Sequence, residues 1–344
     1  MTTIPLRRLG TTDLLVTELG FGAATLGNLF TPISDGVARA ALDMAIDAGI
    51  GYVDTAPHYG RGLSERRTGD ALRLQSDIVV STKVGRLMQP DPTVIDDRER
   101  DGFRSPMPFR MTYDYTGDGI LRSHDHSLQR LGLDHVDILY VHDIGQRTHA
   151  SRASHYWEQL TTGGGFRALE RLRDEGAIKA FGLGVNEVDV CLDAMRETHL
   201  DVILLAGRYT LLEQDALDEL FPALAASDTS IVIGGPYNSG ILAVGTRGGG
   251  VLHYDYGIAP EHVVSRVRQI EDVADRYGVS LPAAALHFVL ANHQVASVIP
   301  GLASADRVKQ TMTLYREQIP DDFWNELREQ NLIRRDAPVP TAAR

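Results

Sequence analysis

The sequence contains a single cysteine, Cys191, and no apolar run near the length needed to cross a bilayer. One cysteine excludes a framework of intrachain disulfides and is typical of a reducing compartment. A membrane span needs about 20 consecutive apolar residues. The opening segment MTTIPLRRLG also lacks the apolar core of a secretory signal. We therefore expect a cytoplasmic protein that does not bind membranes.

Positive charge is also scarce. The 344 residues include 34 Lys and Arg against 46 Asp and Glu, which gives a net charge of −12. Such a chain is repelled by phosphate backbones, so nucleic acid is not an expected partner. The hydrophobic fraction of 43% excludes global disorder. Glycine is abundant, with 33 residues, and this number argues against a helical bundle.

Eight short apolar runs alternate with longer amphipathic segments along the chain. Strands that are apolar on both faces and alternate with helices are typical of a parallel sheet. Eight such units predict the α/β fold class and a (β/α)8 TIM barrel. The expected strands are 19–23, 52–55, 78–84, 137–142, 180–185, 201–206, 230–234 and 296–300. The expected helices are 35–48, 64–74, 119–131, 166–175, 187–198, 215–225, 261–277 and 304–314.

Three intervals are longer than this alternation requires, namely 88–116, 144–165 and 238–259. All three follow the carboxyl ends of expected strands, which is the face where barrel enzymes carry their active sites. We interpret them as loops over a site. The pattern predicts one barrel domain over 1–332, and the segment 333–344 is expected to be a mobile C-terminal tail.

Polar residues end three of the otherwise apolar strands. Asp54, Lys83 and His142 close the second, third and fourth runs, and Tyr59 follows Asp54 in a short turn. Adjacent strands lie about 5 Å apart, so the four side chains can converge. Taken singly, Asp54 and Lys83 are explained as a buried ion pair and His142 as a core histidine. Their occurrence together on the catalytic face favours a catalytic site.

These four residue types suit proton transfer at an alcohol or a carbonyl. A free phenol has a pKa of about 10. An ammonium nearby favours the phenolate and lowers that pKa, and the Asp54 carboxylate would hold Lys83 in place. Tyr59 would then exchange a proton with the substrate near neutral pH, while His142 orients the substrate oxygen. Proton transfer at an alcohol carbon also requires a hydride acceptor, which indicates a nicotinamide cofactor.

Two other chemistries are not supported by the pattern. His124 and His126 point to different sides of a helix, so no metal site is expected. A barrel glycosidase needs two facing carboxylates about 5–10 Å apart, and the strand ends offer Asp54 without a convincing second one. Cys191 is expected to be a small packing residue on a helix.

Together these residues resemble the aldo-keto reductase superfamily, over a similarity that runs from Arg8 to about Leu314. The similarity includes the segment LRRLGTTDL, which the resemblance predicts to be an N-terminal β-hairpin that caps the barrel. The segments YTGDGILRS, SLQRLGL and LYVHDI resemble the aldose dehydrogenase branch. That branch includes D-threo-aldose 1-dehydrogenases (L-fucose dehydrogenases), L-galactose dehydrogenase and pyridoxal 4-dehydrogenase.

The resemblance implies a role for each of the four residues and an extended cofactor across the barrel mouth. Tyr59 would be the general acid and base, Lys83 and Asp54 would tune it, and His142 would orient the substrate. The chain accordingly has no G-x-G-x-x-G fingerprint. Bare backbone at 235–242 would meet the pyrophosphate. The implied cofactor contacts are Gly22, Ala23, Asp54, Asn186, Gly235, Pro236, Tyr237, Asn238, Ser239, Gly301 and Arg307.

The sequence departs from the family pattern where the cofactor is held. The usual Ser-Asn pair falls on Gly184 and Val185, with Asn186 as a substitute one place later, and the usual Gln is Ala206. The Lys of many NADP-preferring members is Gly301 here, so we expect NAD, or dual use of NAD and NADP.

The leading hypothesis is oxidation of the C1 hydroxyl of an aldose to the lactone. The alternatives are a pyridoxal dehydrogenase, a general aldehyde or ketone reductase and, outside catalysis, a cofactor-binding redox sensor. The expected partner is a small sugar or aldehyde, with substrate contacts from His58, Tyr113 and Trp157 in loops near the mouth. Both a monomer and a homo-oligomer remain open.

Overall fold

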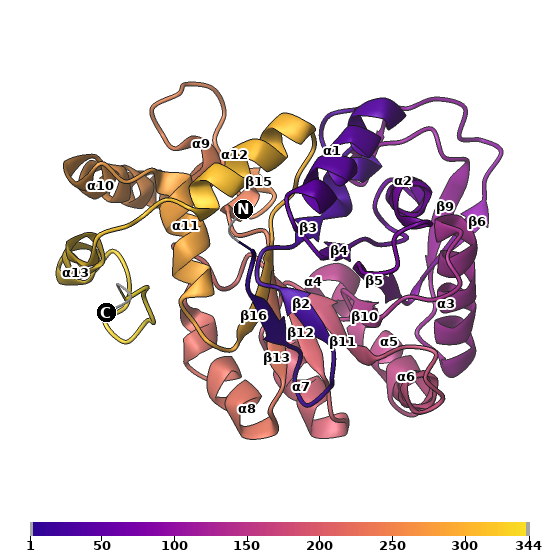
Figure 1. Cartoon of the computed structure of the whole chain (residues 1–344). Helices are drawn as coiled ribbons and strands as arrows, with labels where there is room; N and C mark the ends of the chain where they lie inside the picture. Colours follow the sequence, from indigo (N-terminus) through magenta and orange to yellow (C-terminus); the bar gives the residue numbers. More distant parts are fainter. Residues whose placement is uncertain (1–2, 342–344) are drawn as a thin grey trace.

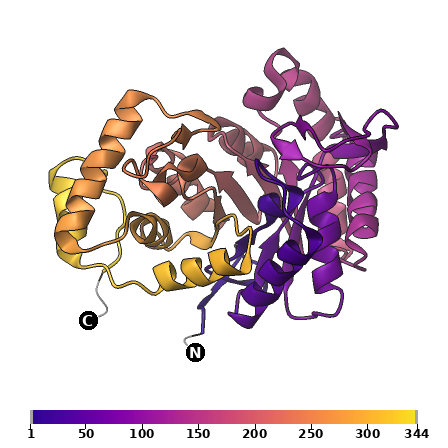
Figure 2. The same cartoon turned by 90° about the horizontal axis from the view of Figure 1, so that it is seen from above.

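The computed structural model describes residues 3–341 and contains a barrel of eight parallel strands within them (Figure 1). Each expected strand is confirmed, with ends that differ by at most two residues. Viewed from above, the helices surround the strands (Figure 2). The strands, in barrel order, are β3 (Phe21–Gly22), β4 (Tyr52–Asp54), β5 (Val79–Val84), β10 (Ile138–His142), β11 (Ala180–Val185), β12 (Val202–Ala206), β13 (Ser230–Gly234) and β16 (Val295–Ile299).

The barrel closes between its first and last strands. The Gly20 amide donates to the Val298 carbonyl at 2.9 Å, and the Gly22 amide donates to the Pro300 carbonyl at 2.9 Å. Gly22 also bridges Gly301 in a parallel arrangement. Closure brings the carboxyl ends of all eight strands to one mouth, where their terminal side chains can meet.

A β-hairpin covers the opposite end of the barrel, as the sequence predicted. It consists of β1 (Leu6–Arg8) and β2 (Leu15–Thr17), which pair antiparallel, and β2 lies beside β16 (Figure 1). Leu9, Leu14 and Val16 are buried in the same apolar cluster as the strand residues inside the barrel. The cap therefore completes the core from below and leaves the upper mouth for loops.

Helices cover the outside of the strands, and two of the longer ones, α11 (Leu281–Leu290) and α13 (Asp321–Glu329), were not expected. Helix α11 is buried on nearly every side, so it lacks the amphipathic period that reveals a surface helix. Helix α13 packs Phe323 and Trp324 into the core. The longer helices are α1 (Asp35–Asp47), α2 (Leu63–Leu72), α3 (Gly117–Leu131), α6 (Gly165–Asp174), α7 (Asp189–Glu197), α8 (Leu220–Ser227), α10 (Glu261–Tyr277), α11 (Leu281–Leu290), α12 (Ala305–Tyr315) and α13 (Asp321–Glu329).

The three long intervals contain regular structure that the sequence did not reveal. Their strands and helices are too short to show a clear period. The first interval contains two antiparallel ribbons, β6 with β9 and β7 with β8, and the next two intervals hold short helices and a hairpin. The elements are β6 (Arg86–Pro90), β7 (Glu99–Arg100), β8 (Phe103–Arg104), β9 (Phe109–Tyr113), α4 (Gln146–His149), α5 (Ala153–Leu160), α9 (Ile241–Val244), β14 (His253–Tyr254) and β15 (Gly257–Ile258).

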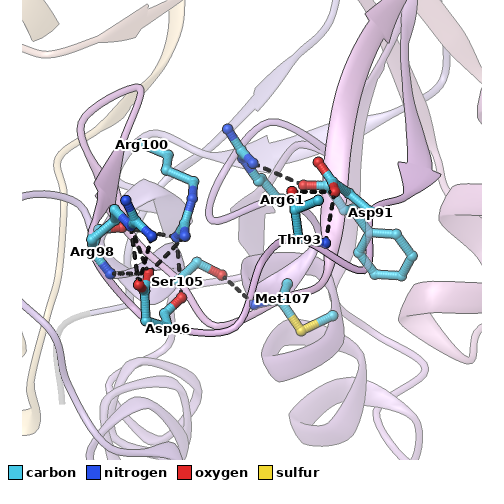
Figure 3. A network of polar contacts seen from close by, with 9 residues as sticks. Arg61, Asp91, Thr93, Asp96, Arg98, Arg100, Ser105 and Met107 are labelled. Atoms are coloured by element: carbon cyan, nitrogen blue, oxygen red, sulfur yellow. Dashed lines mark hydrogen bonds and ion pairs between the residues drawn. The ribbon is translucent and has the colours of Figure 1, made fainter.

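Charged side chains brace the first of these intervals (Figure 3). The Asp96 carboxylate accepts from Arg98 at 3.0 Å and from Arg100 at 2.7 Å. Arg61, in the turn before α2, donates to the Phe109 carbonyl at 2.8 Å and pairs with Asp101 at 3.1 Å. The Asp96 contacts hold the interval together, and the Arg61 contacts join it to the turn before α2 at the barrel mouth.

The segment after Leu332 does not separate from the barrel where the sequence pattern ends. Ile333 and Ala337 are buried in the main apolar cluster, so residues 333–341 pack as part of the domain. The last three residues of the expected tail, 342–344, lie outside the described residues. Among residues 3–341, none of the helices is long and apolar enough to span a membrane.

Two helical glycines test the packing of this fold. A Cβ on Gly69 in α2 would lie 1.6 Å from the Leu131 carbonyl oxygen at the end of α3. We therefore expect Gly69→Ala to destabilise the protein by about 1–3 kcal/mol or more through overpacking. Exposed Gly36 in α1 has only the Ser34 hydroxyl at 3.9 Å, so Gly36→Ala should stabilise by about 0.5–1 kcal/mol. Calorimetry on both variants is the measurement, and a Gly69→Ala melting temperature at or above wild type would contradict the packing.

Candidate active site

The four residues singled out from the sequence meet at the mouth of the barrel. Asp54 ends β4, Lys83 lies near the end of β5, and His142 ends β10. Tyr59 comes from the turn between β4 and α2, and its ring centroid lies 5.9 Å from that of His142. The Lys83 ammonium is 4.7 Å from the centroid of the Tyr59 ring. The predicted convergence is therefore present in the structure.

Lys83 and Asp54 form a buried ion pair. The Lys83 Nζ donates to the Asp54 carboxylate at 2.6 Å and to the Thr55 carbonyl at 2.9 Å, and both charged side chains are 2% exposed. Burial raises the pKa of Asp54 and lowers that of Lys83, and the opposite charge of each partner counters the shift. A Cβ at position 184 would lie 3.2 Å from the Lys83 Cε, so glycine leaves room for the extended lysine.

The electrostatics of Tyr59 differ from the expectation drawn from its neighbours. We expected the ammonium to lower its pKa, but burial and the negative charges of Asp54 and Asp143 raise the pKa of Tyr59 well above 10.0. Arg86 acts in the opposite direction with a smaller effect. Asp54 neutralises much of the field of Lys83, which explains why the lysine does not dominate. Tyr59 is thus a neutral phenol at neutral pH.

His142 is also neutral at physiological pH. Burial first, and then the charges of Arg86 and Lys83, lower the pKa of His142 well below 6.5. Its backbone carbonyl accepts from the Tyr115 hydroxyl at 2.7 Å, which fixes the end of β10. Its Nδ1 is buried and has no hydrogen-bond partner within residues 3–341. A neutral imidazole can donate from one nitrogen and accept at the other, which suits the orientation of a hydroxyl.

Tyr59, Lys83 and His142 line a cavity of about 610 Å³ that is large enough for a small substrate. Two of the three expected substrate residues, His58 and Tyr113, also line it. Trp157 does not: the structure places it on α5 with its ring packed edge-on against Phe166. Sequence proximity to a loop was therefore a poor guide for Trp157, because the loop folds into a helix whose apolar side turns to the core.

A second charged pair lies in the cavity wall. Arg86, at the start of β6, donates to the carboxylate of Asp143, which follows His142 directly. The expectation that no second carboxylate stands at a strand end was therefore wrong. Asp143 could have been found from its place after the end of β10, whereas Arg86 lies in β6, outside the barrel strands, and the sequence pattern gave no signal for it. Both carboxylates, Asp54 and Asp143, are held in ion pairs with cations.

A hairpin from a distant part of the chain reaches the same cavity. It consists of β14 and β15, and Tyr256 at its turn lines the cavity. Asp255 accepts from Arg147 at 3.0 Å and from Arg208 at 2.8 Å, and the Tyr256 amide donates to the Ser239 hydroxyl at 2.9 Å. No local sequence pattern could reveal that this hairpin contributes to the site.

Several expected cofactor residues line cavities at the mouth. Asn186 lines the catalytic cavity, and Tyr237, Gly301 and Arg307 line a second cavity of about 340 Å³. The Tyr237 hydroxyl is buried without a hydrogen-bond partner in the described part of the chain. A Cβ on Gly240 would meet nothing within 4 Å, so the backbone there is open to a ligand. These features fit an extended dinucleotide.

Several other residues of the expected cofactor set are buried or make contacts within the protein. Ala23 is fully buried in the core, and its neighbour Ala24 lines the catalytic cavity instead. The Asn238 side chain accepts from Thr210 at 2.5 Å and donates to the Gly207 carbonyl at 3.3 Å. The structure places Gly22 at the barrel closure and Ser239 against the hairpin, while Gly235 is exposed and Pro236 is buried.

The buried ion pair predicts a stability cycle. Removal of one partner leaves the other charge uncompensated, so Asp54→Asn and Lys83→Met should each destabilise the protein by about 3–5 kcal/mol. The double variant leaves no unpaired charge, and its loss should be smaller than the sum of the two. Calorimetric melting temperatures test this, and losses that simply add would contradict the pairing.

Comparisons with known proteins agree with this geometry. The model of the Aldo/keto reductase family matches residues 18–331. A pyridoxal 4-dehydrogenase of Microbacterium luteolum is 44% identical over 335 residues, which are 95% of this chain and 97% of that protein. A D-threo-aldose 1-dehydrogenase of a Pseudomonas species is 42% identical over 327 residues, which are 93% of this chain and 95% of that protein.

A solved structure extends the agreement to three dimensions. An aldo-keto reductase from Bacillus halodurans, in its holo form, superposes with a TM-score of 0.70 at 25% identity, over 98% of this chain and 99% of that one. The barrel, the mouth that carries the four residues and the sequence matches all lead to one assignment. This chain belongs to the aldo/keto reductase family and is a nicotinamide-dependent oxidoreductase.

Proposed function

We propose that this enzyme oxidises the C1 hydroxyl of an aldose to the lactone, with Tyr59 as the proton acceptor. The observation that carries the proposal is the cavity in which a phenol lies beside a buried ammonium and a neutral imidazole. The D-threo-aldose dehydrogenase relative, at 42% identity, supports a sugar substrate.

Each side chain has a distinct task in this proposal. His142 orients the C1 hydroxyl through a neutral ring nitrogen, and the Tyr59 phenolate takes the hydroxyl proton. Lys83, fixed by Asp54, stabilises the phenolate form by its charge. Because the pKa of Tyr59 is raised, the phenolate is scarce at neutral pH, and oxidation of the hydroxyl should become faster as the pH rises.

We assign the cofactor contacts from the two cavities at the barrel mouth. The chemistry that a bound nicotinamide supplies is acceptance of hydride from C1. Asn186 would hold its carboxamide, the backbone at 235–240 its pyrophosphate, and Arg307 its adenosine end. Among residues 3–341, Arg307 is the sole cation in the lining of the second cavity, and Gly301 brings no second charge for a 2′-phosphate. We therefore propose a preference for NAD over NADP.

Oxidation of pyridoxal is the second candidate. It is favoured by the 44% identity to a pyridoxal 4-dehydrogenase over 95% of the chain. The aromatic cavity wall from Phe103 and Tyr113 would suit a flat ring. The same Tyr59 chemistry would serve this substrate.

A substrate screen separates these candidates. The purified enzyme is assayed with aldoses, including L-fucose, and with pyridoxal, each with NAD and NADP, by absorbance of the reduced cofactor. We expect the highest kcat/KM with L-fucose and NAD. A higher value with pyridoxal would favour the second candidate, and faster carbonyl-dependent oxidation of NADPH would overturn both.

The matched control for this screen is Tyr59→Phe. It removes the proton acceptor and keeps the ring, so kcat should fall by at least about 100-fold. Cofactor affinity, measured by fluorescence titration, should stay near that of the wild type. Turnover close to wild type in a folded Tyr59→Phe variant would contradict the proposed mechanism.

A further inference from the structure

Arg86 brings a second cation into the wall of the catalytic cavity, and its contacts leave a donor unused. The residue is 4% exposed, and its guanidinium lies 5.5 Å from the centroid of the Tyr113 ring. Nη2 donates to Asp143, whereas Nη1 meets only the Met111 sulfur at 3.6 Å, a weak acceptor. Nε is buried without a partner anywhere in residues 3–341. The guanidinium therefore has donor capacity left at the cavity wall, and Nη1 can exchange its weak sulfur acceptor for a ligand oxygen.

Asp143 complements Arg86 in hydrogen-bonding character. Its side chain lines the cavity and is 21% exposed. Its contacts with Arg86 and with the His142 Nε2, at 3.3 Å, both use Oδ2. An ionised carboxylate only accepts hydrogen bonds and a guanidinium only donates them. A hydroxyl group does both, so one hydroxyl can satisfy the two side chains together.

The charges around the cavity favour an uncharged ligand. Lys83 is neutralised by Asp54, and Arg86 by Asp143. Glu99 and Asp101 also line the cavity and add negative charge. Arg61 pairs with Asp101 and compensates that carboxylate. His58 and His142 stay neutral because burial and Arg86 lower the pKa of both. The cavity therefore offers no net positive charge to a phosphate or a carboxylate group.

We propose that Arg86 and Asp143 form a hydroxyl-recognition pair for an uncharged polyhydroxy substrate. The inference rests on the proposed function, because the reacting carbon is assigned through Tyr59 and His142. Asp143 contacts His142, which orients the reacting oxygen on C1. The pair therefore lies beside the adjacent carbon, C2, and binds the hydroxyl group on it. Arg86 donates to that oxygen, and its hydrogen is donated to Asp143. The two residues determine specificity and take no part in proton transfer.

The test compares L-fucose with 2-deoxy-L-fucose, which lacks only the C2 hydroxyl. We expect the wild type to favour L-fucose by at least about 100-fold in kcat/KM, because a site built to bind a hydroxyl rejects an analogue without it. Arg86→Met combined with Asp143→Asn removes both charges and leaves neither unpaired. In this double variant the ratio should fall to within about tenfold, through loss of activity on L-fucose. Arg86→Lys keeps the charge but loses the planar fork, and should give an intermediate ratio.

The matched control is Arg334→Met combined with Asp218→Asn. These residues form an ion pair at 2.5 Å, and neither lines the catalytic cavity. This control should keep the wild-type ratio. A folded Arg86 variant with the wild-type ratio, or a wild type that does not discriminate, would overturn the recognition pair alone. A wild type that does not oxidise L-fucose would instead overturn the proposed function.

Discussion

Lys83 carries a positive charge into the interior of the barrel, where it is tolerated because the Asp54 carboxylate accepts from it at 2.6 Å. Much of the site is arranged around this pair. Asp54 is held in turn by the Ser81 hydroxyl at 2.7 Å, and Gly184 leaves space for the lysine stem. The lysine lies against the Tyr59 ring, so the position of the phenol is coupled to the pair. The charge of the lysine is largely compensated, which is why Tyr59 keeps its proton at neutral pH.

A second neutralised pair, Arg86 with Asp143, stands across the same cavity. The two pairs give the cavity strong hydrogen-bonding groups without net positive charge. Such a wall suits sugars and other uncharged polar molecules better than phosphorylated ones. Tyr59, which transfers the proton, is thus separate from Arg86 and Asp143, which bind the rest of the substrate. Substrate preference can therefore change without loss of proton transfer.

The barrel and the four residues at its mouth could be predicted from the sequence because they obey local patterns. Strands such as β5 are buried on both faces, and Lys83, the one charged residue of that strand, stands out near its end. Helix α11 could not be seen because it is buried on nearly every side and has no polar face. Tyr256 and Arg86 reach the cavity through ribbons outside the barrel strands, and their positions depend on long-range contacts such as those of Asp255 with Arg147 and Arg208. The expectation for Trp157 failed in the opposite way, because a residue expected in the cavity does not line it. The segment forms helix α5, and the Trp157 ring packs against Phe166.

The central claim is that Tyr59 exchanges the proton that accompanies hydride transfer. Its most direct test is the pH dependence of a single turnover of L-fucose oxidation, followed by stopped-flow absorbance of the reduced cofactor. Because the neutral phenol must lose its proton first and its pKa is raised, the rate should rise with pH between about 6 and 9, and Tyr59→Phe should lose both the rate and this dependence. A wild-type rate that falls or stays level over this range, or a Tyr59→Phe variant with the same profile, would contradict the assignment.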